Sequence, residues 1–404
     1  MANYFLAWEL GGGLGHVGRL QPLAAGLHAL GHTVTLGLRD LTHTYALLQP
    51  LPVPRLQAPV WLHETRGVPT PMVSLAEILL CAGYLRSSDL AALVQGWMTL
   101  LQQVRAEVVV ADYAPTALLA ARILGLPSAS LGTGFWMPPK RQPMPPFRDW
   151  EPVQPGRVER AEAQVLASVN AVLAMHQAPP LARLCDLLHG DMPLLCSWPE
   201  IDHFERAPDE HNEWLGPNFL PEAGTAPHWP EGDGPRVFAY LKAGHPDHPA
   251  VLDALVAQGC RVACYVPEVC AGMPPPRVSP RIHYAPGPLD LATTCAEADL
   301  VVCHAGQATL VQALLRGVPL LLLPMQPEQF VMARQVERSG AAINAAARRR
   351  PTDFKALLNE LLADGPRRDA ARAFAQKYAG FSHAGQVADL LQRLQQLPAL
   401  ATGR

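Results

Sequence analysis

Short apolar runs alternate with amphipathic stretches along most of the chain. In the first half the apolar runs cover residues 4–8, 33–38, 108–111 and 128–131, and helical stretches cover residues 17–30 and 115–124. Runs that are apolar throughout are typical of parallel strands whose two faces are both covered by helices. The pattern therefore predicts an α/β fold with a doubly wound parallel sheet.

The same alternation restarts in the second half. Expected strands cover residues 236–241, 261–266, 282–284, 300–303 and 320–323, and expected helices cover 309–315, 353–363, 366–378 and 383–397. Between the halves the sequence is rich in Gly, Pro and acidic residues, which is typical of a linker. We therefore expect a first domain over residues 1–215, a linker over 216–235, a second doubly wound domain over 236–380 and a C-terminal helix over 381–404.

Composition narrows the class of protein. A chain of 404 residues with 49% apolar and 17% charged residues can supply two cores, and a net charge of −3 gives no reason to expect a nucleic-acid partner. The eight cysteines form no C-x-x-C pair, so neither a zinc site nor another metal centre is expected. The chain shows no signal peptide and no apolar stretch of about 20 residues, which predicts a cytoplasmic protein without an indicated membrane association.

One strand-to-helix turn in the second half has the composition of an anion site. The strand over residues 300–303 is followed by His304-Ala305-Gly306-Gln307-Ala308 and then by a helix from Thr309. Backbone N–H groups at the positive end of a helix can bind a diphosphate, and the His304 ring could add a donor. A tight turn that only needs Gly306 is the alternative.

A second polar loop is expected at the same edge of that sheet. The loop over residues 324–329 follows the next apolar strand and contains Glu328 and Gln329, whose side chains can bind hydroxyl groups. An anion site and a hydroxyl-binding loop at one sheet edge suggest a nucleotide-linked sugar.

The glycine-rich turn after the first strand is open to two interpretations. GLGHVG over residues 13–18 has the G-x-G-x-x-G spacing of a nicotinamide or flavin site, with Asp40 about 20 residues further on. Alternatively, the turn presents His16 as a base, because an imidazole titrates near neutral pH and a carboxylate can orient it.

The stretch over residues 298–342 resembles the donor-binding signature of GT-B glycosyltransferases, in the branch of the UDP-glycosyltransferases and macrolide glycosyltransferases. Three motifs carry the resemblance: H-x-G-x-x-[ST] at His304–Thr309, G-x-P at Gly317–Pro319, and [DE]-Q at Glu328–Gln329. The resemblance implies two Rossmann-like domains that face each other across a cleft, with the last helix crossing back to the first domain. It assigns the diphosphate to residues 304–309, namely His304, Ala305, Gly306, Gln307, Ala308 and Thr309, and the sugar hydroxyls to Glu328 and Gln329.

The resemblance extends to the first half and includes departures from the family pattern. It implies that His16 is the base and that Asp112 orients it. It also assigns Gly15, and Thr133 after the fourth expected strand, to the nucleotide-sugar site. Arg19 stands where the family usually has a proline. Gln312 stands where many members have the glutamate that binds the ribose. The tryptophan that stacks on the base in plant members has no counterpart, so UDP and dTDP both remain open.

Together these features predict an inverting, metal-independent glycosyltransferase. It would move a hexose from a UDP- or dTDP-sugar to a hydroxyl of an apolar small molecule, with the nucleotide sugar as co-substrate and no cofactor. Two alternatives remain: an NAD- or FAD-dependent enzyme that uses the GLGHVG turn, and a catalytically silent nucleotide-sugar-binding partner protein. The His16–Asp112 pair argues against the second.

Overall fold

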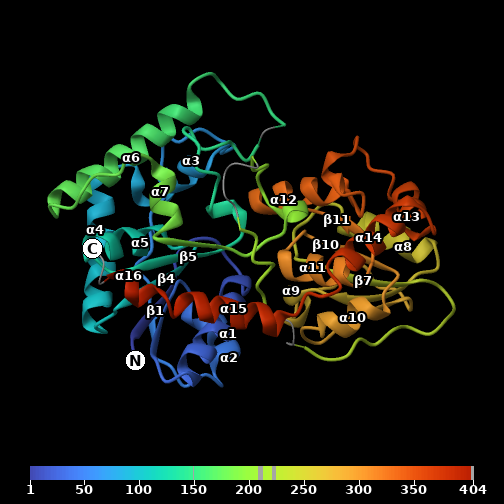
Figure 1. Ribbon diagram of the computed structural model, residues 1–404. Helices are drawn as coiled ribbons and strands as arrows, with labels where there is room; N and C mark the ends of the chain where they lie inside the picture. The colour runs from blue at the N-terminus through green and yellow to red at the C-terminus, as the bar shows by residue number, and fades with distance from the viewer. Residues whose placement is uncertain (149, 208–212, 221–223, 402–404) are drawn as a thin grey trace. The chain divides into compact units, whose positions relative to one another are not determined.

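Parallel pairing of the apolar runs builds two six-stranded sheets (Figure 1). The computed structural model of the chain describes residues 1–148, 150–207, 213–220 and 224–401. It divides into a first unit, Met1–Asn218 with His383–Arg404, and a second unit, Phe219–Ser382. Each unit contains one sheet with helices packed on it, so the expected fold class of two doubly wound, Rossmann-like domains is confirmed.

The first sheet has the strand order β3-β2-β1-β4-β5-β6, and all neighbouring strands are parallel. Its strands are β1 (Asn3–Trp8), β2 (Thr33–Leu38), β3 (Arg55–Gln57), β4 (Val108–Asp112), β5 (Ser128–Gly132) and β6 (Met192–Leu195). The four apolar runs account for β1, β2, β4 and β5. The two edge strands, β3 and β6, escape the pattern because they are short and contain polar residues or a proline, which an edge tolerates.

The helices of the first unit cover its sheet and include the end of the chain. They are α1 (Gly15–Ala29), α2 (Leu41–Leu48), α3 (Leu75–Leu79), the π-helical turn η1 (Leu80–Tyr84), α4 (Ser87–Gln103), α5 (Pro115–Ile123), the 3₁₀ turn η2 (Gly134–Trp136), α6 (Arg157–Met175), α7 (Leu184–His189), the 3₁₀ turn η3 (Pro199–Ile201), α15 (His383–Leu394) and α16 (Leu397–Ala401). Two boundaries correct the sequence expectation. Helix α1 begins at Gly15, and the helix expected over residues 383–397 ends at Leu394 and is followed by α16.

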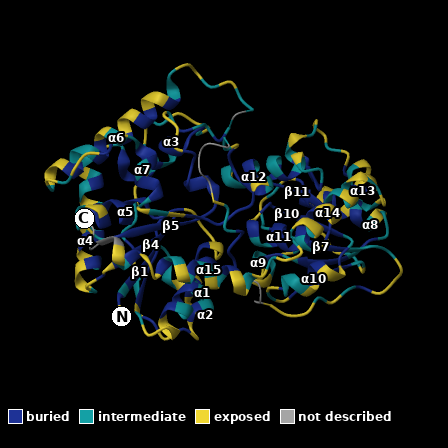
Figure 2. Cartoon of the chain, in the orientation of Figure 1, coloured by how far each residue is buried: buried dark blue, intermediate teal, exposed yellow. Residues whose placement is uncertain are grey.

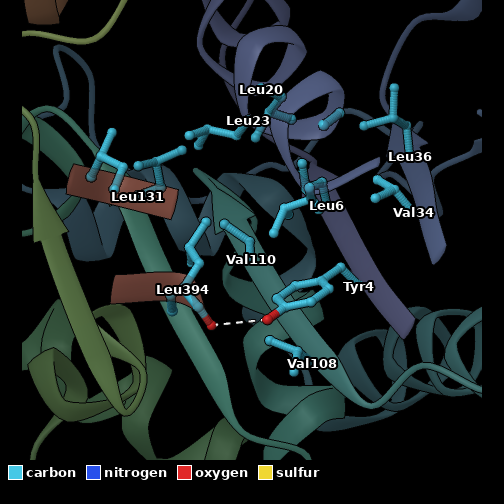
Figure 3. Close-up of a cluster of buried hydrophobic side chains, with 14 of the residues drawn as sticks. Tyr4, Leu6, Leu20, Leu23, Val34, Leu36, Val108, Val110, Leu131 and Leu394 are labelled. Atoms are coloured by element: carbon cyan, nitrogen blue, oxygen red, sulfur yellow. Dashed lines mark hydrogen bonds between the residues drawn. The ribbon is translucent and has the colours of Figure 1, made fainter. Parts of the chain in front are cut away.

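The core of the first unit joins both ends of its chain. Leu390, Leu394 and Leu397 are buried in the cluster formed by β1, β2, β4 and α1, and Tyr4 lies in the same cluster (Figure 3). The Tyr4 hydroxyl donates a hydrogen bond of 3.0 Å to the carbonyl of Leu394. A Cβ at Gly26 of α1 would lie 2.4 Å from Leu391 Cδ1, so glycine allows the close approach of α15. The C-terminal helix is therefore an integral part of this core.

The second sheet has the strand order β12-β11-β10-β7-β8-β9 and is also parallel throughout. Its strands are β7 (Arg236–Tyr240), β8 (Arg261–Tyr265), β9 (Ile282–Tyr284), β10 (Leu300–Cys303), β11 (Leu320–Leu322) and β12 (Ala342–Asn344). Strand β12 is absent from the sequence expectation because only two of its three residues are apolar, which leaves no apolar run to detect. Figure 2 shows the strands of both sheets as mainly buried, in accord with their runs of apolar residues.

The helices of the second unit surround its own core. They are α8 (His248–Ala257), α9 (Pro267–Cys270), α10 (Leu291–Glu297), α11 (Gln307–Leu315), α12 (Pro327–Arg338), the 3₁₀ turn η4 (Ala345–Ala347), α13 (Phe354–Leu362) and α14 (Pro366–Lys377). The expected loop over residues 324–329 is corrected here, since α12 begins at Pro327. A proline at the first helical position and a capping box at Gln326 and Gln329 explain this start.

The segment between the two sheets, residues 216–235, is attached at several points. The Asn218 amide donates to the carbonyl of Arg19 in the first unit, and Thr225 pairs with Leu289 in the second. Residues 221–223 of this expected linker lie outside the described part of the chain. Within the described residues, no helix combines the length and the apolar character needed to cross a membrane.

Candidate active site

The carboxyl ends of β1 and β4 bring the candidate base and its partner together. Trp8 and Asp112, the last residues of these strands, are paired in register, and the glycine-rich turn after β1 leads into α1. His16 is the second residue of α1 and is 5% exposed, whereas Asp112 is fully buried. His16 Nδ1 lies 2.9 Å from Asp112 Oδ1. The two residues that the sequence singles out therefore form a buried pair.

Gly11 determines the space beside the other ring nitrogen of His16. Its φ is +77°, and a Cβ at this position would lie 2.5 Å from His16 Nε2 and 3.3 Å from Tyr113 Cδ1. A side chain at residue 11 would therefore be strained and would press on the imidazole. Gly15 has a different environment, since a Cβ there would meet no atom within 4 Å. Of these two glycines, only Gly11 has to be a glycine to leave room for the His16 imidazole.

Arg19 completes the buried cluster, and sequence reasoning assigns it no role. Its Nε donates to Asp112 Oδ2 at 2.8 Å, and its Nη2 lies 3.3 Å from Asp112 Oδ1 and 3.0 Å from His16 Nδ1. The guanidinium also lies over the Trp136 ring, 5.0 Å from its centroid. The signal that could have found it is the spacing of three residues between His16 and Arg19, which places both on one face of a helix.

Burial and charge act in opposite directions on the Asp112 carboxyl. Burial alone would raise its pKa, but Arg19 and then His16 lower it, and the net pKa lies below the usual value. Aromatic rings enclose the cluster: Trp8 stacks on the imidazole with centroids 5.2 Å apart, and the Trp136 ring lies at 5.4 Å. The carboxylate therefore stays ionised in a site largely shielded from water.

Two other candidate residues of the first unit, Thr133 and Asp40, are a buried residue and a helix cap. Thr133 follows β5, the fifth strand of the chain and not the fourth, because the sequence pattern does not predict β3; its side chain is fully buried. Asp40, the acid of the dinucleotide interpretation, accepts from the backbone N–H of His43 at 3.0 Å and caps α2. Hydrogen bonds from His43 lower the pKa of Asp40. The Asp40 carboxylate, which would have to bind a ribose in the dinucleotide interpretation, is therefore already hydrogen-bonded to the start of α2.

The turn between β10 and α11 has its unusual backbone at Ala305. Ala305 adopts φ +61°, whereas Gly306 has φ −67° and is the N-cap of α11. The interpretation of a tight turn that needs Gly306 for its conformation is therefore wrong. A Cβ at Gly306 would meet no atom within 4 Å, and the first turn of α11, which contains Gln307, Ala308 and Thr309, has no acidic residue and no side-chain cap. This helix terminus can accept an anion.

His304 has a structural role that differs from the expected one. Its Nδ1 lies 2.5 Å from the carbonyl oxygen of Leu323, and its Nε2 accepts from the backbone N–H of Lys242 at 2.8 Å. Burial lowers the pKa of His304 to about 4. The neutral ring thus donates through Nδ1 and accepts through Nε2, and it has no donor left for a diphosphate. Its position ties together the loops that follow β7 and β11.

The remaining candidates of the second unit lie on two helices. On α11, Gln307, Thr309 and Gln312 are 8%, 4% and 7% exposed. Glu328 and Gln329 lie in the first turn of α12, where they are half-buried. Gln329 Oε1 accepts from the backbone N–H groups of Met325 and Gln326 at 2.9 and 3.2 Å. Gln329 therefore caps the helix with its oxygen, and the capping box does not use its amide nitrogen.

Three histidine rings lie close together at the same sheet edge. The centroids of His245, His248 and His304 are 5.2 to 5.8 Å apart. The Nε2 of His248 is buried and has no hydrogen-bond partner among the residues that the structure describes. In the same part of the chain, however, no group of three or more His, Cys, Asp or Glu side chains has an arrangement that could hold a metal ion.

Comparison with known sequences identifies the catalytic class. Residues 280–387 match the model of the glycosyltransferase family 28 C-terminal domain. A PGL/p-HBAD biosynthesis glycosyltransferase of Mycobacterium tuberculosis is 25% identical over 353 residues, which cover 83% of this chain and 80% of the relative. A PGL/p-HBAD biosynthesis rhamnosyltransferase of Mycobacterium bovis is 27% identical over 268 residues, or 62% of this chain and 58% of the relative.

Solved structures share the fold over nearly the whole chain. The spinosyn rhamnosyltransferase SpnG has a TM-score of 0.70 at 18% identity and covers 98% of this chain and 100% of its own. The glycosyltransferase VinC, solved with dTDP, has a TM-score of 0.64 at 16% identity and covers 97% and 100%. The resemblance seen in the motifs is confirmed, and the dinucleotide-dependent alternative is set aside. The chain is a glycosyltransferase with the GT-B fold, and its residues 280–387 are similar to the glycosyltransferase family 28 C-terminal domain.

Proposed function

We propose that this glycosyltransferase moves a hexose from a UDP- or dTDP-sugar to a hydroxyl of an apolar small molecule, with inversion and without a metal. The observation that carries the proposal is the buried His16–Asp112 pair, 2.9 Å between Nδ1 and Oδ1. With its proton on Nδ1, the imidazole donates to Asp112 and leaves Nε2 basic. Nε2 then takes the proton of the acceptor hydroxyl as the oxygen attacks the anomeric carbon.

The departing nucleoside diphosphate would be bound by the second unit. The N-terminus of α11 includes the N–H groups of Ala308 and Thr309, and its first turn contains no acidic side chain to oppose an anion. Such a terminus offsets charge that develops on the leaving group. Gln312 on α11 and Glu328 and Gln329 on α12 are proposed to bind the ribose and the sugar hydroxyls.

The related structures support the substrate classes. VinC and SsfS6 were solved with thymidine diphosphate, and SpnG was solved with spinosyn aglycone. Their complexes favour a nucleoside diphosphate sugar as the donor and a natural-product hydroxyl as the acceptor.

The first test measures nucleotide binding. Calorimetry with UDP and dTDP should show binding of at least one of them by the wild type. We propose that the Thr309 hydroxyl also donates to the diphosphate, so Thr309→Ala, which removes this hydroxyl and keeps the backbone N–H, should weaken binding by about 1.5–3 kcal/mol, the value of a hydrogen bond to a charged group. An unchanged affinity in this variant would remove Thr309 from the diphosphate site.

The second test measures transfer. UDP-glucose and dTDP-rhamnose are offered with a panel of macrolide and aromatic alcohols, and the product is quantified by mass spectrometry. His16→Ala should keep the nucleotide affinity and lose roughly 10²- to 10⁴-fold in rate, the usual contribution of a positioned base. Nucleotide binding without any turnover by the wild type would favour the catalytically silent partner protein instead.

A further inference from the structure

The environment of His16 Nδ1 contains an acceptor and a donor that cannot both be satisfied. Asp112 Oδ1 lies at 2.9 Å and Arg19 Nη2 at 3.0 Å from this nitrogen. A carboxylate only accepts and a guanidinium only donates, whereas a neutral imidazole nitrogen does one or the other. A proton on Nδ1 satisfies Asp112, and a lone pair on Nδ1 satisfies Arg19.

The two arrangements differ in what Nε2 can do. When Nδ1 carries the proton, Nε2 is a base; when Arg19 donates to Nδ1, the proton of the neutral ring resides on Nε2. Arg19 also contacts both oxygens of Asp112, at 2.8 and 3.3 Å, so the imidazole shares its carboxylate with a permanent cation. The positive charge opposes the imidazolium that proton transfer creates.

We propose that Arg19 is a positioning residue that shares the Asp112 carboxylate with His16 and places a fixed positive charge against the imidazolium that forms when the base takes a proton. The proposal rests on the proposed function, in which His16 takes the acceptor proton. Arg19 is 6% exposed and lies over the Trp136 ring, so the guanidinium is fixed beside the pair by packing as well as by charge.

The other titratable groups that face the pair do not supply this effect. Tyr113, the residue after β4, presents its ring to the imidazole with centroids 6.3 Å apart. Cys196, which follows β6, lies near Arg19 and Asp112, and burial raises the pKa of its thiol to about 12, so that it stays neutral. Among these groups Arg19 is the only cation in contact with His16 and Asp112.

The experiment follows the titration of His16 by NMR on the full chain with ¹³Cε1-labelled histidine, the signal being identified by its loss in His16→Gln. In Arg19→Met the midpoint should move to higher pH by one unit or more, which is a tenfold or larger gain in proton affinity. In Arg19→Lys, which keeps a cation, it should stay near the wild-type midpoint. The acid limb of the pH profile of kcat/KM should move in the same direction as the midpoint.

The matched control removes a comparable buried ion pair elsewhere in the first unit. Arg157 Nε lies 2.6 Å from Glu77 Oε1, and Arg157→Met should leave the His16 midpoint unchanged. If Arg19→Met fails to fold by circular dichroism, Arg19→Gln, which keeps a neutral donor, is judged by the same criterion. A midpoint in the neutral variant equal to or below that of the wild type overturns the proposal. The titration needs no substrate, so it can succeed or fail independently of transfer.

Discussion

Gly11 is the residue whose side chain is constrained most directly by the candidate base. Its left-handed backbone, and the distance of only 2.5 Å that would separate a Cβ here from His16 Nε2, leave no room for alanine. We expect Gly11→Ala to displace the imidazole and to lower the transfer rate roughly 10²-fold, the scale associated with a small misplacement of a catalytic group. Nucleotide affinity, measured by calorimetry, should be unchanged.

The neighbouring glycine provides the control for that prediction. A Cβ at Gly12 would meet no atom within 4 Å, so Gly12→Ala should keep most of the activity. Equal losses in the two variants would mean that the turn as a whole, and not the space beside Nε2, determines the rate.

His248 should make the second unit sensitive to acid. Burial, then His304 and His245, lower its pKa to about 3 from the ordinary value near 6.5. Between these values the unfolded chain binds a proton that the folded chain excludes, so the stability that this residue contributes is present above pH 6.5 and is lost as the pH falls toward 3. His248→Leu should therefore flatten the decline of the melting temperature between about pH 7 and pH 4.

The exposed His228 of the same unit serves as the comparison, and His228→Leu should follow the wild-type curve. A His248→Leu protein that loses stability with acid as steeply as the wild type would show that other groups dominate this range.

At the level of single residues, the sequence predicted the candidate pair and missed what surrounds it. The pairing of His16 with Asp112 was implied by the resemblance to GT-B glycosyltransferases, and the parallel sheet places both residues at one edge because each follows an apolar strand. Arg19 could not, because its contacts depend on a rotamer that bends a long side chain back onto Asp112. The sequence assigns His304 to a ligand because nothing in it shows that the ring binds two backbone groups.

In the turn before helix α11, the residue with the strained backbone is Ala305, whereas the neighbouring Gly306 is the N-cap of the helix. Ala305 has φ +61°, a conformation that costs a non-glycine residue about 1–2 kcal/mol. Because glycine also loses more chain entropy on folding, Ala305→Gly should stabilise the protein by at most about 1 kcal/mol. Chemical denaturation measures this gain, and the affinity for UDP or dTDP should not change.

Gly306→Ala is the complementary change in the same turn. Its φ of −67° suits alanine and its Cβ would lie in open space, so the variant should fold. A methyl group there lies where a diphosphate would approach the N–H groups of α11, and we expect the nucleotide affinity to fall at least tenfold. Wild-type affinity in Gly306→Ala would place the diphosphate elsewhere.

At the level of elements, prediction succeeded for most strands and failed for three of them. The missed strands β3, β6 and β12 lie at sheet edges and are three or four residues long. They contain polar residues or a proline, or have only two apolar residues in succession, so they show no apolar run that the sequence pattern could detect. At the start of α12 the sequence pattern predicts a loop because the composition is polar. The proline and the capping box there mark a helix start that the pattern of apolar residues alone does not reveal.

At the scale of the whole molecule, each unit has its own hydrophobic core, so we expect each unit to unfold in its own transition. Leu394 is fully buried in the core of the first unit, although it lies near the end of the chain, and Leu358 is fully buried in the core of the second. Truncating either side chain to alanine should cost about 2–5 kcal/mol. Because each loss falls on one unit, calorimetric unfolding should resolve two transitions, with Leu394→Ala lowering the first unit's transition and Leu358→Ala the second's.

Nucleotide binding assigns each transition to its unit, because a ligand stabilises only the unit that binds it. Saturating UDP or dTDP should raise the transition that Leu358→Ala lowers and should leave the one that Leu394→Ala lowers in place. The Leu394→Ala protein should keep wild-type nucleotide affinity while it loses transfer activity at temperatures where its first unit has melted. If both variants lower a single shared transition, the two units unfold as one cooperative body, and the C-terminal helix α15 stabilises the whole chain instead of the first unit alone.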